Sequence, residues 1–262
     1  MAISNTIKRA LIVLAHPEPR SFNAQMKDAA AEQLRASGIA VAVSDLHQLA
    51  FDPVEASHHF PVRQDPDWFR PQAEQRYAFE QGAVSLDVKA EIEKLQWADL
   101  VIFQYPLWWY GMPAILKGWI DRVFTYGGVY TSRERYDHGR FQGKHAMLSV
   151  TVGAPQSTYG PSGRNGDIDL VMWPSCFTLY YVGFSVHRPF VSYGVEGGLQ
   201  YSNTSTMLER LSLQKDAFKT RIAGIESDKP MEFNRWEDWD ADGRLQASAP
   251  AFSQFIRHPK SS

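Results

Sequence analysis

Residues 10–15 read Ala-Leu-Ile-Val-Leu-Ala, an unbroken apolar run in which polar and apolar side chains do not alternate. A strand with this pattern is buried on both faces, as in a parallel sheet that helices cover on either side. Residues 99–104, Asp-Leu-Val-Ile-Phe-Gln, carry a second run of this kind. We therefore expect a central parallel sheet whose connecting segments include covering helices.

The segments around these two strands follow the order that such a sheet requires. Residues 23–37 carry apolar side chains at helical spacing and end before Gly38, a residue type favoured at helix C-termini. Residues 39–46 are predicted to form a strand, which completes a right-handed βαβ unit. Two more strands are expected at residues 146–152 and 184–192. Further helices are expected at residues 85–96, 113–123, 167–182, where Pro174 should interrupt the helix, and 204–225.

Five strands that alternate with helices predict a doubly wound α/β fold. The expected sheet is parallel and flavodoxin-like, with strand order 2-1-3-4-5 and helices on both faces. Residues 1–226 are assigned to this flavodoxin-like domain, with an excursion outside the sheet at residues 51–82. Pro, His, Asp and Gln are frequent in the excursion, and one short helix is expected near residues 72–81. Residues 227–262 are expected to form a C-terminal extension that packs at the surface of the domain or of a dimer.

Charge and cysteine content narrow the range of partners. The net charge of −2 and the pI near 6.4 provide no excess of cations for a nucleic acid or an anionic membrane surface. We therefore expect a small organic substrate, no nucleic acid and no membrane insertion. Cys176 is the single cysteine, which excludes an intramolecular disulfide and suits the cytoplasm. Residues 10–15 are too short for a signal sequence or a membrane span.

The loop at residues 16–23 reads His-Pro-Glu-Pro-Arg-Ser-Phe-Asn and leads into a predicted helix. The free N–H groups and the dipole of a helix N-terminus favour a bound phosphate, and Ser21 and Asn23 could add donors. The alternative is that one of these two residues only caps the helix. Neither a Walker motif nor Gly-x-Gly-x-x-Gly is present, which disfavours a P-loop NTPase and a fingerprint dehydrogenase.

The loop at residues 104–113 places Trp108, Trp109 and Tyr110 directly after a central strand. An isoalloxazine ring would explain these aromatic residues, because the loop could flank its rings and offer backbone N–H groups to its pyrimidine edge. The alternative is that the aromatic side chains pack against the following helix.

The loop at residues 151–165 contains several glycines, which permit close backbone approach to a ligand, and it carries Tyr159. A phenol at this place could stabilise charge on a reduced flavin or a quinone oxygen, although a single tyrosine is more often an ordinary loop residue. Elsewhere, His58 and His59 suggest a metal site. Because neighbouring side chains of an extended segment point to opposite faces, we interpret them as solvated residues and expect no metal site.

Several segments in matching order carry a family resemblance over roughly residues 9–195. These are residues 16–23, 99–104 with Pro106 and Leu107, 113–119, Ser44-Asp45-Leu46, Tyr136-Asp137 and Trp173-Pro174. Together they resemble the NAD(P)H:quinone oxidoreductases, or DT-diaphorases. The resemblance implies a homodimer with one FAD per subunit, FMN being possible, that is reduced by NAD(P)H at the flavin N5. It also implies that a quinone is then reduced in the same site, in a ping-pong two-electron reaction.

The resemblance also assigns roles to individual residues. The phosphate and ribose part of FAD would be held by His16, Ser21, Phe22 and Asn23. The isoalloxazine would be lined by Pro106, Leu107, Trp108, Trp109 and Tyr110, and its polar edge would be contacted by Thr151, Val152, Gly153 and Ala154. Tyr159 matches the tyrosine that faces the reduced flavin.

Two positions depart from the well-studied animal enzymes. Asn165 stands where those enzymes have a histidine partner for the tyrosine, and Asn cannot take up a proton at physiological pH. Trp108 replaces a polar residue. The segment 159–165 resembles bacterial members and the flavoprotein subunits of potassium efflux systems, so a regulatory flavoprotein is the alternative function. An FMN electron carrier fits the fold but not the length.

Overall fold

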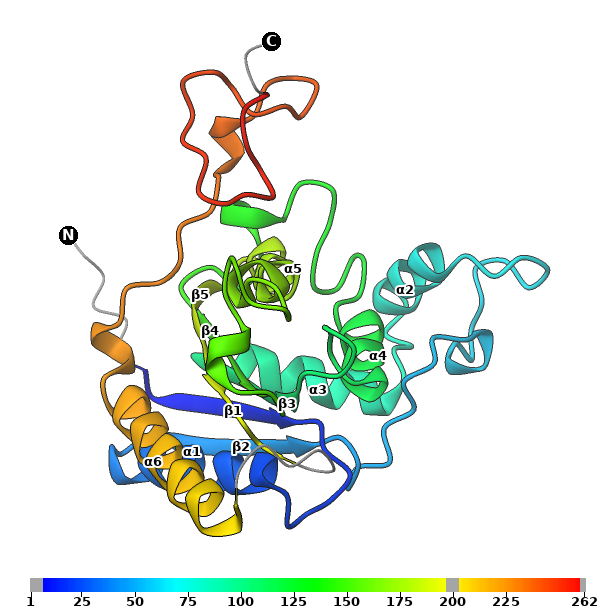
Figure 1. Ribbon diagram of the computed structural model, residues 1–262. Helices are drawn as coiled ribbons and strands as arrows, with labels where there is room; N and C mark the ends of the chain where they lie inside the picture. Colours follow the sequence, from blue (N-terminus) through cyan, green and yellow to red (C-terminus); the bar gives the residue numbers. More distant parts are fainter. Residues whose placement is uncertain (1–6, 197–202, 260–262) are drawn as a thin grey trace.

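The computed structural model describes residues 7–196 and 203–259 and contains one five-stranded parallel sheet (Figure 1). The strand order is β2-β1-β3-β4-β5, which confirms the predicted flavodoxin-like order. The strands are β1 (Arg9–Leu14), β2 (Ala40–Asp45), β3 (Leu100–Pro106), β4 (His145–Thr151) and β5 (Ser185–Ser192). The helices are α1 (Phe22–Ala36), α2 (Pro71–Glu80), α3 (Leu86–Trp97), α4 (Ala114–Val123), α5 (Ile168–Tyr181) and α6 (Thr204–Ala223).

Helices cover both faces of the sheet, as predicted. Helices α1 and α6 lie on one face, and α3, α4 and α5 lie on the other (Figure 1). On the first face, Met26 of α1 and Phe218 of α6 belong to the same buried cluster as Ile12 of β1. On the second face, the ring of Trp119 in α4 lies 5.8 Å from the ring of Phe103 in β3, measured between centroids. The apolar runs of the strands are therefore buried on both sides.

Strands β1, β3 and β4 end at the same edge of the sheet. Leu14 pairs in register with Gln104, and Pro106 pairs with Thr151. The strand order reverses between β1 and β3, so the loops that follow these strands leave the sheet side by side. Doubly wound proteins bind their ligands at such a position.

Helix α5 continues through Pro174, so the predicted interruption is wrong. A proline inside a helix costs about 3 kcal/mol, because it removes one N–H and crowds the preceding turn. Met172, Cys176 and Leu179 of this helix are buried in the core, and this tertiary packing outweighs the local cost.

Residues 51–82 lie outside the sheet and contain a single 3₁₀ turn at Ser57–His59 as well as helix α2. Gln75 attaches this excursion to the domain, because its Nε2 donates to the backbone carbonyl of Asp121 and its Oε1 accepts from the N–H of Tyr126. The expectation that His58 and His59 point to opposite faces is wrong. In the 3₁₀ turn their ring centroids lie only 4.1 Å apart.

The C-terminal extension packs on α5 (Figure 1). The ring of Phe255 stacks on Trp173 at 4.7 Å, and the ring of Phe233 stacks on Tyr180 at 4.5 Å. Nearer the sheet, the N–H of Met231 donates to the carbonyl of Val186 in β5 over 2.7 Å. The extension is thus joined to the domain both by aromatic stacking and at the backbone of the outermost strand.

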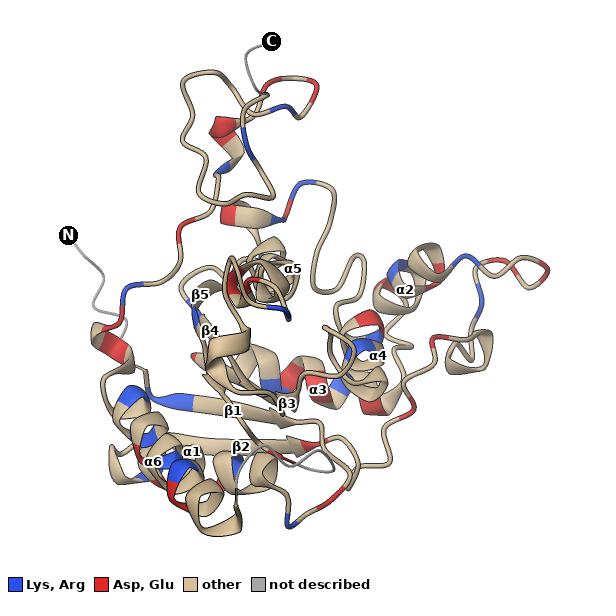
Figure 2. Cartoon of the chain, in the orientation of Figure 1, with Lys and Arg blue, Asp and Glu red and all other residues tan. Residues whose placement is uncertain are grey.

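Charged side chains of both signs are interspersed along α3, α4 and α6 (Figure 2). Within the described ranges 7–196 and 203–259, no helix combines the length and the apolarity needed to cross a bilayer.

Candidate active site

Three buried polar side chains join the segments that follow β1, β3 and β4. Gln104 donates a hydrogen bond from Nε2 to Oδ1 of Asn23 over 2.9 Å. Asn23 in turn donates from Nδ2 to Oγ1 of Thr151, also over 2.9 Å. All three residues are buried. Because buried polar groups are costly to leave unpaired, this Asn23–Gln104–Thr151 network fixes the spacing of the loops at the sheet edge.

The N-terminus of α1 lies at the centre of this edge. Ser21 is the N-cap, and its Oγ accepts a hydrogen bond from the N–H of Ala24 over 3.1 Å, so the capping alternative is realised. The side chains of Phe22 and Asn23 are buried, and their N–H groups belong to the first turn, where a helix itself offers no acceptor. The helix start therefore offers backbone donors and a positive dipole end to an anion.

His16 connects the first loop with the second. Its Nδ1 accepts a hydrogen bond from the N–H of Glu18 over 3.1 Å, and its ring centroid lies 6.3 Å from that of Trp108. Partial burial lowers the pKa of His16 from its ordinary value of 6.5. The imidazole is therefore neutral at physiological pH and acts here as a neutral hydrogen-bonding and ring-packing group.

The loop after β3 is held firmly at its base. Pro106 ends β3, and the N–H of Leu107 donates to the carbonyl of Thr151 over 2.9 Å. Trp108 and Gly111 exchange backbone hydrogen bonds of 3.1 and 3.0 Å, which close a two-residue turn.

The two residues inside this turn adopt a strained conformation and present large aromatic side chains. Trp109 has φ 51° and Tyr110 has φ 61°, values in the left-handed region that costs roughly 1–2 kcal/mol for a residue with a Cβ. The Trp109 side chain is 98% exposed, and that of Tyr110 is 57% exposed. Backbone strain that carries exposed aromatic rings indicates a binding role, because packing within this chain does not account for it.

The loop after β4 is attached to the end of β5 and to the segment that follows it. The N–H of Val152 donates to the carbonyl of Ser192 over 2.8 Å, and the carbonyl of Ala154 accepts from the N–H of Gly194 over 3.0 Å. Gly153 lies between them and is exposed. This arrangement leaves the backbone at Gly153 accessible at the site edge.

Residues 158–166 close the remainder of this loop. The Nδ2 of Asn165 donates to Oγ1 of Thr158 over 2.8 Å, and its N–H donates to the Thr158 carbonyl over 2.9 Å. Tyr159, the residue next to Thr158, is half-buried, and its ring centroid lies 5.7 Å from that of Tyr193. A Cβ at Gly163 would lie 2.3 Å from the Thr158 carbonyl oxygen, so this tight closure requires glycine. Asn165 therefore acts on the segment that positions Tyr159.

The arrangement joins three chemical capacities at one edge: backbone donors for a phosphate, exposed rings for a planar ligand and a phenol on an adjoining loop. The family model described as a flavodoxin-like fold matches residues 8–214. NAD(P)H dehydrogenase [quinone] 1 from Cavia porcellus is 46% identical over 191 residues, which are 72% of this chain and 70% of that protein. The chain belongs to the NAD(P)H:quinone oxidoreductase family.

Other members of the family show the same relationship. Ribosyldihydronicotinamide dehydrogenase [quinone] from Homo sapiens is 40% identical over 72% of this chain and 83% of that protein. The crystal structure of a candidate quinone reductase from Klebsiella pneumoniae superposes with a TM-score of 0.82 at 37% identity, over 91% of this chain and 94% of that chain.

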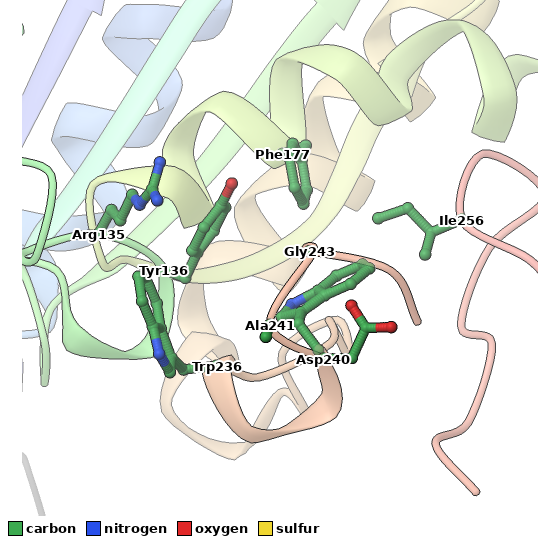
Figure 3. Close-up of a pocket in the computed structure, with 9 residues that line it drawn as sticks. Arg135, Tyr136, Phe177, Trp236, Asp240, Ala241, Gly243 and Ile256 are labelled. Atoms are coloured by element: carbon green, nitrogen blue, oxygen red, sulfur yellow. The ribbon is translucent and has the colours of Figure 1, made fainter. Parts of the chain in front are cut away.

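A separate cavity of about 320 Å³ lies between the C-terminal extension and the domain (Figure 3). Tyr136 and Phe177 contribute from the domain, and Trp236 and Ile256 contribute from the extension. The sequence predicted a C-terminal extension that packs at a surface, but it contained no signal for this cavity.

Gln104 is the site residue that the sequence did not single out. It is the first polar side chain after a run of apolar residues in β3, which is the one local signal that could have identified it. Its partner Asn23 lies 81 residues away in the sequence. Asn23 in turn donates to Thr151, which is 128 residues from Asn23.

Proposed function

We propose that this protein catalyses the two-electron reduction of quinones by NAD(P)H with a flavin bound at the edge of β1, β3 and β4. The observation that carries the proposal is the strained turn that exposes Trp109 and Tyr110 beside the N-terminus of α1. A flavin nucleotide needs both features, a surface for its planar ring and donors for its phosphate.

The residues of this edge match the chemistry of that cofactor. A bound flavin would accept two electrons from a nicotinamide and pass them to a quinone. The N–H groups of Phe22 and Asn23 would bind the phosphate, while His16 and Ser21 complete the loop around it. The segment from Pro106 to Tyr110 would line the ring system, and residues 151–154 would offer backbone groups to its polar edge.

Tyr159 is proposed as the residue that stabilises negative charge at the reacting centre. A phenol O–H can donate a hydrogen bond to an oxyanion at no cost in net charge. Asn165 would support this role indirectly through its two hydrogen bonds to Thr158. Asn165 cannot take up a proton, so the site would stabilise charge by hydrogen bonding and not through a protonated partner of Tyr159.

We further propose that the functional unit is a homodimer and that the cofactor is FAD. A Trp side chain that is 98% exposed next to a half-exposed Trp108 is unfavourable in water, and a second copy of the chain could cover it while completing the site. The preference for FAD over FMN rests on family membership, and the ping-pong order follows from one site that serves both substrates. A single, buried free thiol, Cys176, supports the cytoplasm as the compartment.

One purified sample tests the main proposal. Its visible absorbance identifies a bound flavin, and release by denaturation followed by chromatography distinguishes FAD from FMN. Anaerobic titration with NADPH or NADH should bleach the flavin, and addition of a quinone should restore its absorbance. A protein that binds neither flavin, or whose reduced flavin does not react with quinones, would overturn the proposal.

A further inference from the structure

Asp52, His58 and His59 gather three metal-binding side chains in the excursion after β2. Oδ2 of Asp52 lies 3.4 Å from Nε2 of His58 and 3.2 Å from Nε2 of His59. One potential ligand atom from each residue lies within 4.8 Å of the others. The three residues are hereafter called the Asp52 cluster.

The separations in this cluster match those between the ligands of a tetrahedral metal ion. Zinc binds imidazole nitrogen and carboxylate oxygen at about 2.0–2.2 Å, which places neighbouring ligand atoms about 3.3 Å apart in a tetrahedron. The two separations from Asp52 Oδ2 are therefore close to those of a bound state. Two imidazoles and one carboxylate also form a donor set that suits divalent first-row transition metals.

The backbone beneath the cluster is fixed by a buried arginine. Nη1 of Arg122 in α4 donates to the carbonyl of Asp52 over 2.7 Å, and its guanidinium lies 5.0 Å from the centroid of the Phe51 ring. At the next residue, Pro53, the chain packs so closely on α4 that a Cβ at Gly118 would lie 2.0 Å from the Pro53 carbonyl oxygen. Asp52 is thus held on a rigid base, as a metal ligand requires.

A backbone hydrogen bond orients the Asp52 carboxylate. The N–H of Val54 donates to Oδ1 of Asp52 over 3.0 Å. The other carboxylate oxygen, Oδ2, lies next to the two imidazoles. Nε2 of His59 also lies 3.0 Å from the carbonyl of Val54, and a metal would displace this contact. Val54 is 61% exposed, so water can take over that carbonyl.

The two histidines differ in freedom. The His59 side chain is 12% exposed and that of His58 is 66% exposed. The imidazole of His59 is therefore fixed beside Asp52, and that of His58 can adjust to the ion. The fourth coordination position of the ion would face solvent. A site with three protein ligands and one open position is a known arrangement for zinc.

We propose that Asp52, His58 and His59 bind a divalent transition metal ion of the zinc class, with water in the fourth position. The ion would join the 3₁₀ turn to the segment that follows β2 and so stabilise the excursion. The proposal is independent of the flavin site, because all three ligands lie within residues 52–59.

Isothermal titration of the flavin-loaded, tag-free protein with ZnCl₂, after treatment with EDTA and its removal, tests the site. We expect one zinc ion per chain, and binding about tenfold or more weaker in His58→Ala, in His59→Ala and in Asp52→Asn. His138→Ala is the matched control, because Nε2 of His138 also lies near a single carboxylate, 3.9 Å from Oδ2 of Asp137. This variant should bind zinc like the wild type.

Thermal unfolding provides a second readout, because a metal that binds the folded protein raises its Tm. Zinc should raise the Tm of the wild type and of His138→Ala, and it should leave the Tm of the His58→Ala/His59→Ala double variant unchanged. Circular dichroism of the metal-free double variant should match that of the wild type, since both histidines lie in one short 3₁₀ turn outside the sheet. Equal zinc binding by the wild type and the double variant, or no binding by the wild type, would overturn the proposal.

Discussion

Gln104 in β3 and Asn23 in α1 form a 2.9 Å side-chain hydrogen bond in the buried interior, directly beneath the loops that carry the candidate active site. The Nδ2 group of Asn23 donates a second hydrogen bond, to Oγ1 of Thr151. A polar network, and not apolar packing alone, therefore positions the site. Substitutions in this network can measure how much it contributes to stability.

Asn23→Ala should destabilise the protein by about 2–4 kcal/mol, because it leaves buried groups of Gln104 and Thr151 unpaired. Urea unfolding measures this change. A double-mutant cycle with Thr151→Ala should give a coupling energy of about 0.5–3 kcal/mol. If Asn23→Ala lowered the free energy of unfolding by less than about 0.5 kcal/mol, the network would not stabilise the loops as described.

Trp109→Ala should change the free energy of unfolding of the flavin-free protein by no more than about 0.5 kcal/mol, since the side chain is almost fully exposed. It should weaken flavin binding by about tenfold, equal to about 1.4 kcal/mol of lost ring contact. Fluorescence titration with flavin measures the affinity. Trp68→Ala is the matched control, because Trp68 is 68% exposed in the excursion, and its affinity should equal that of the wild type.

Tyr159→Phe should slow flavin reduction by NAD(P)H by about one order of magnitude, because one charge-stabilising donor is worth roughly 1–3 kcal/mol. Stopped-flow absorbance under anaerobic conditions measures this rate. Tyr193→Phe removes the hydroxyl of the neighbouring ring and should have a smaller effect. An unchanged rate in Tyr159→Phe would remove this residue from the mechanism.

The reduction rate of the wild type should be flat between about pH 6 and 8, because Asn165, which we propose as the residue that supports Tyr159, cannot take up a proton. Asn165→Ala should lower the rate less than Tyr159→Phe does, since Asn165 acts through the loop at Thr158. The same stopped-flow experiment in a series of buffers measures the profile. An inflection near the pKa of a histidine would count against the assignment.

Stability should depend on pH through a second pair of histidines, of which His187 is buried and His145 is partly buried. Nε2 of His187 lies 3.0 Å from Nδ1 of His145, and Nδ1 of His187 lies 2.8 Å from Oδ2 of Asp228. Burial lowers the pKa of both histidines below 6.5, against the opposing pull of Asp228 on His187. The unfolded chain thus binds more protons than the folded protein as the pH falls below 6.5. The free energy of unfolding should then decrease by up to about 1.4 kcal/mol per pH unit for each histidine.

Urea midpoints at pH values on both sides of 6.5 measure this dependence. His145→Gln should make it shallower, and His47→Ala, which removes an exposed histidine, should preserve it. Parallel curves for the wild type and His145→Gln would show that the His145–His187 pair does not contribute.

The fold could be predicted from the sequence because its signals are local. Unbroken apolar strands and helical spacing identify each element, and the rule for doubly wound sheets then locates the three loops. The side-chain partners could not be predicted in this way. Asn23 reads as a surface residue at a helix start, and only contacts 81 and 128 residues away turn it inward.

Two local predictions failed where a short element or a tertiary contact decided the structure. A three-residue 3₁₀ turn has no periodicity, so the convergence of His58 and His59 on Asp52 had no sequence signal. Pro174 indicated a break, but the buried face of α5 overrides it.

The hydrogen bond from Met231 to Val186 has a consequence for solubility. β5 is an outer strand of the sheet, and an uncovered outer strand offers its backbone to strands of other molecules. By occupying part of β5, the extension protects the protein from edge-to-edge aggregation. A chain shortened before Met231 would lose this protection even if its site stayed intact.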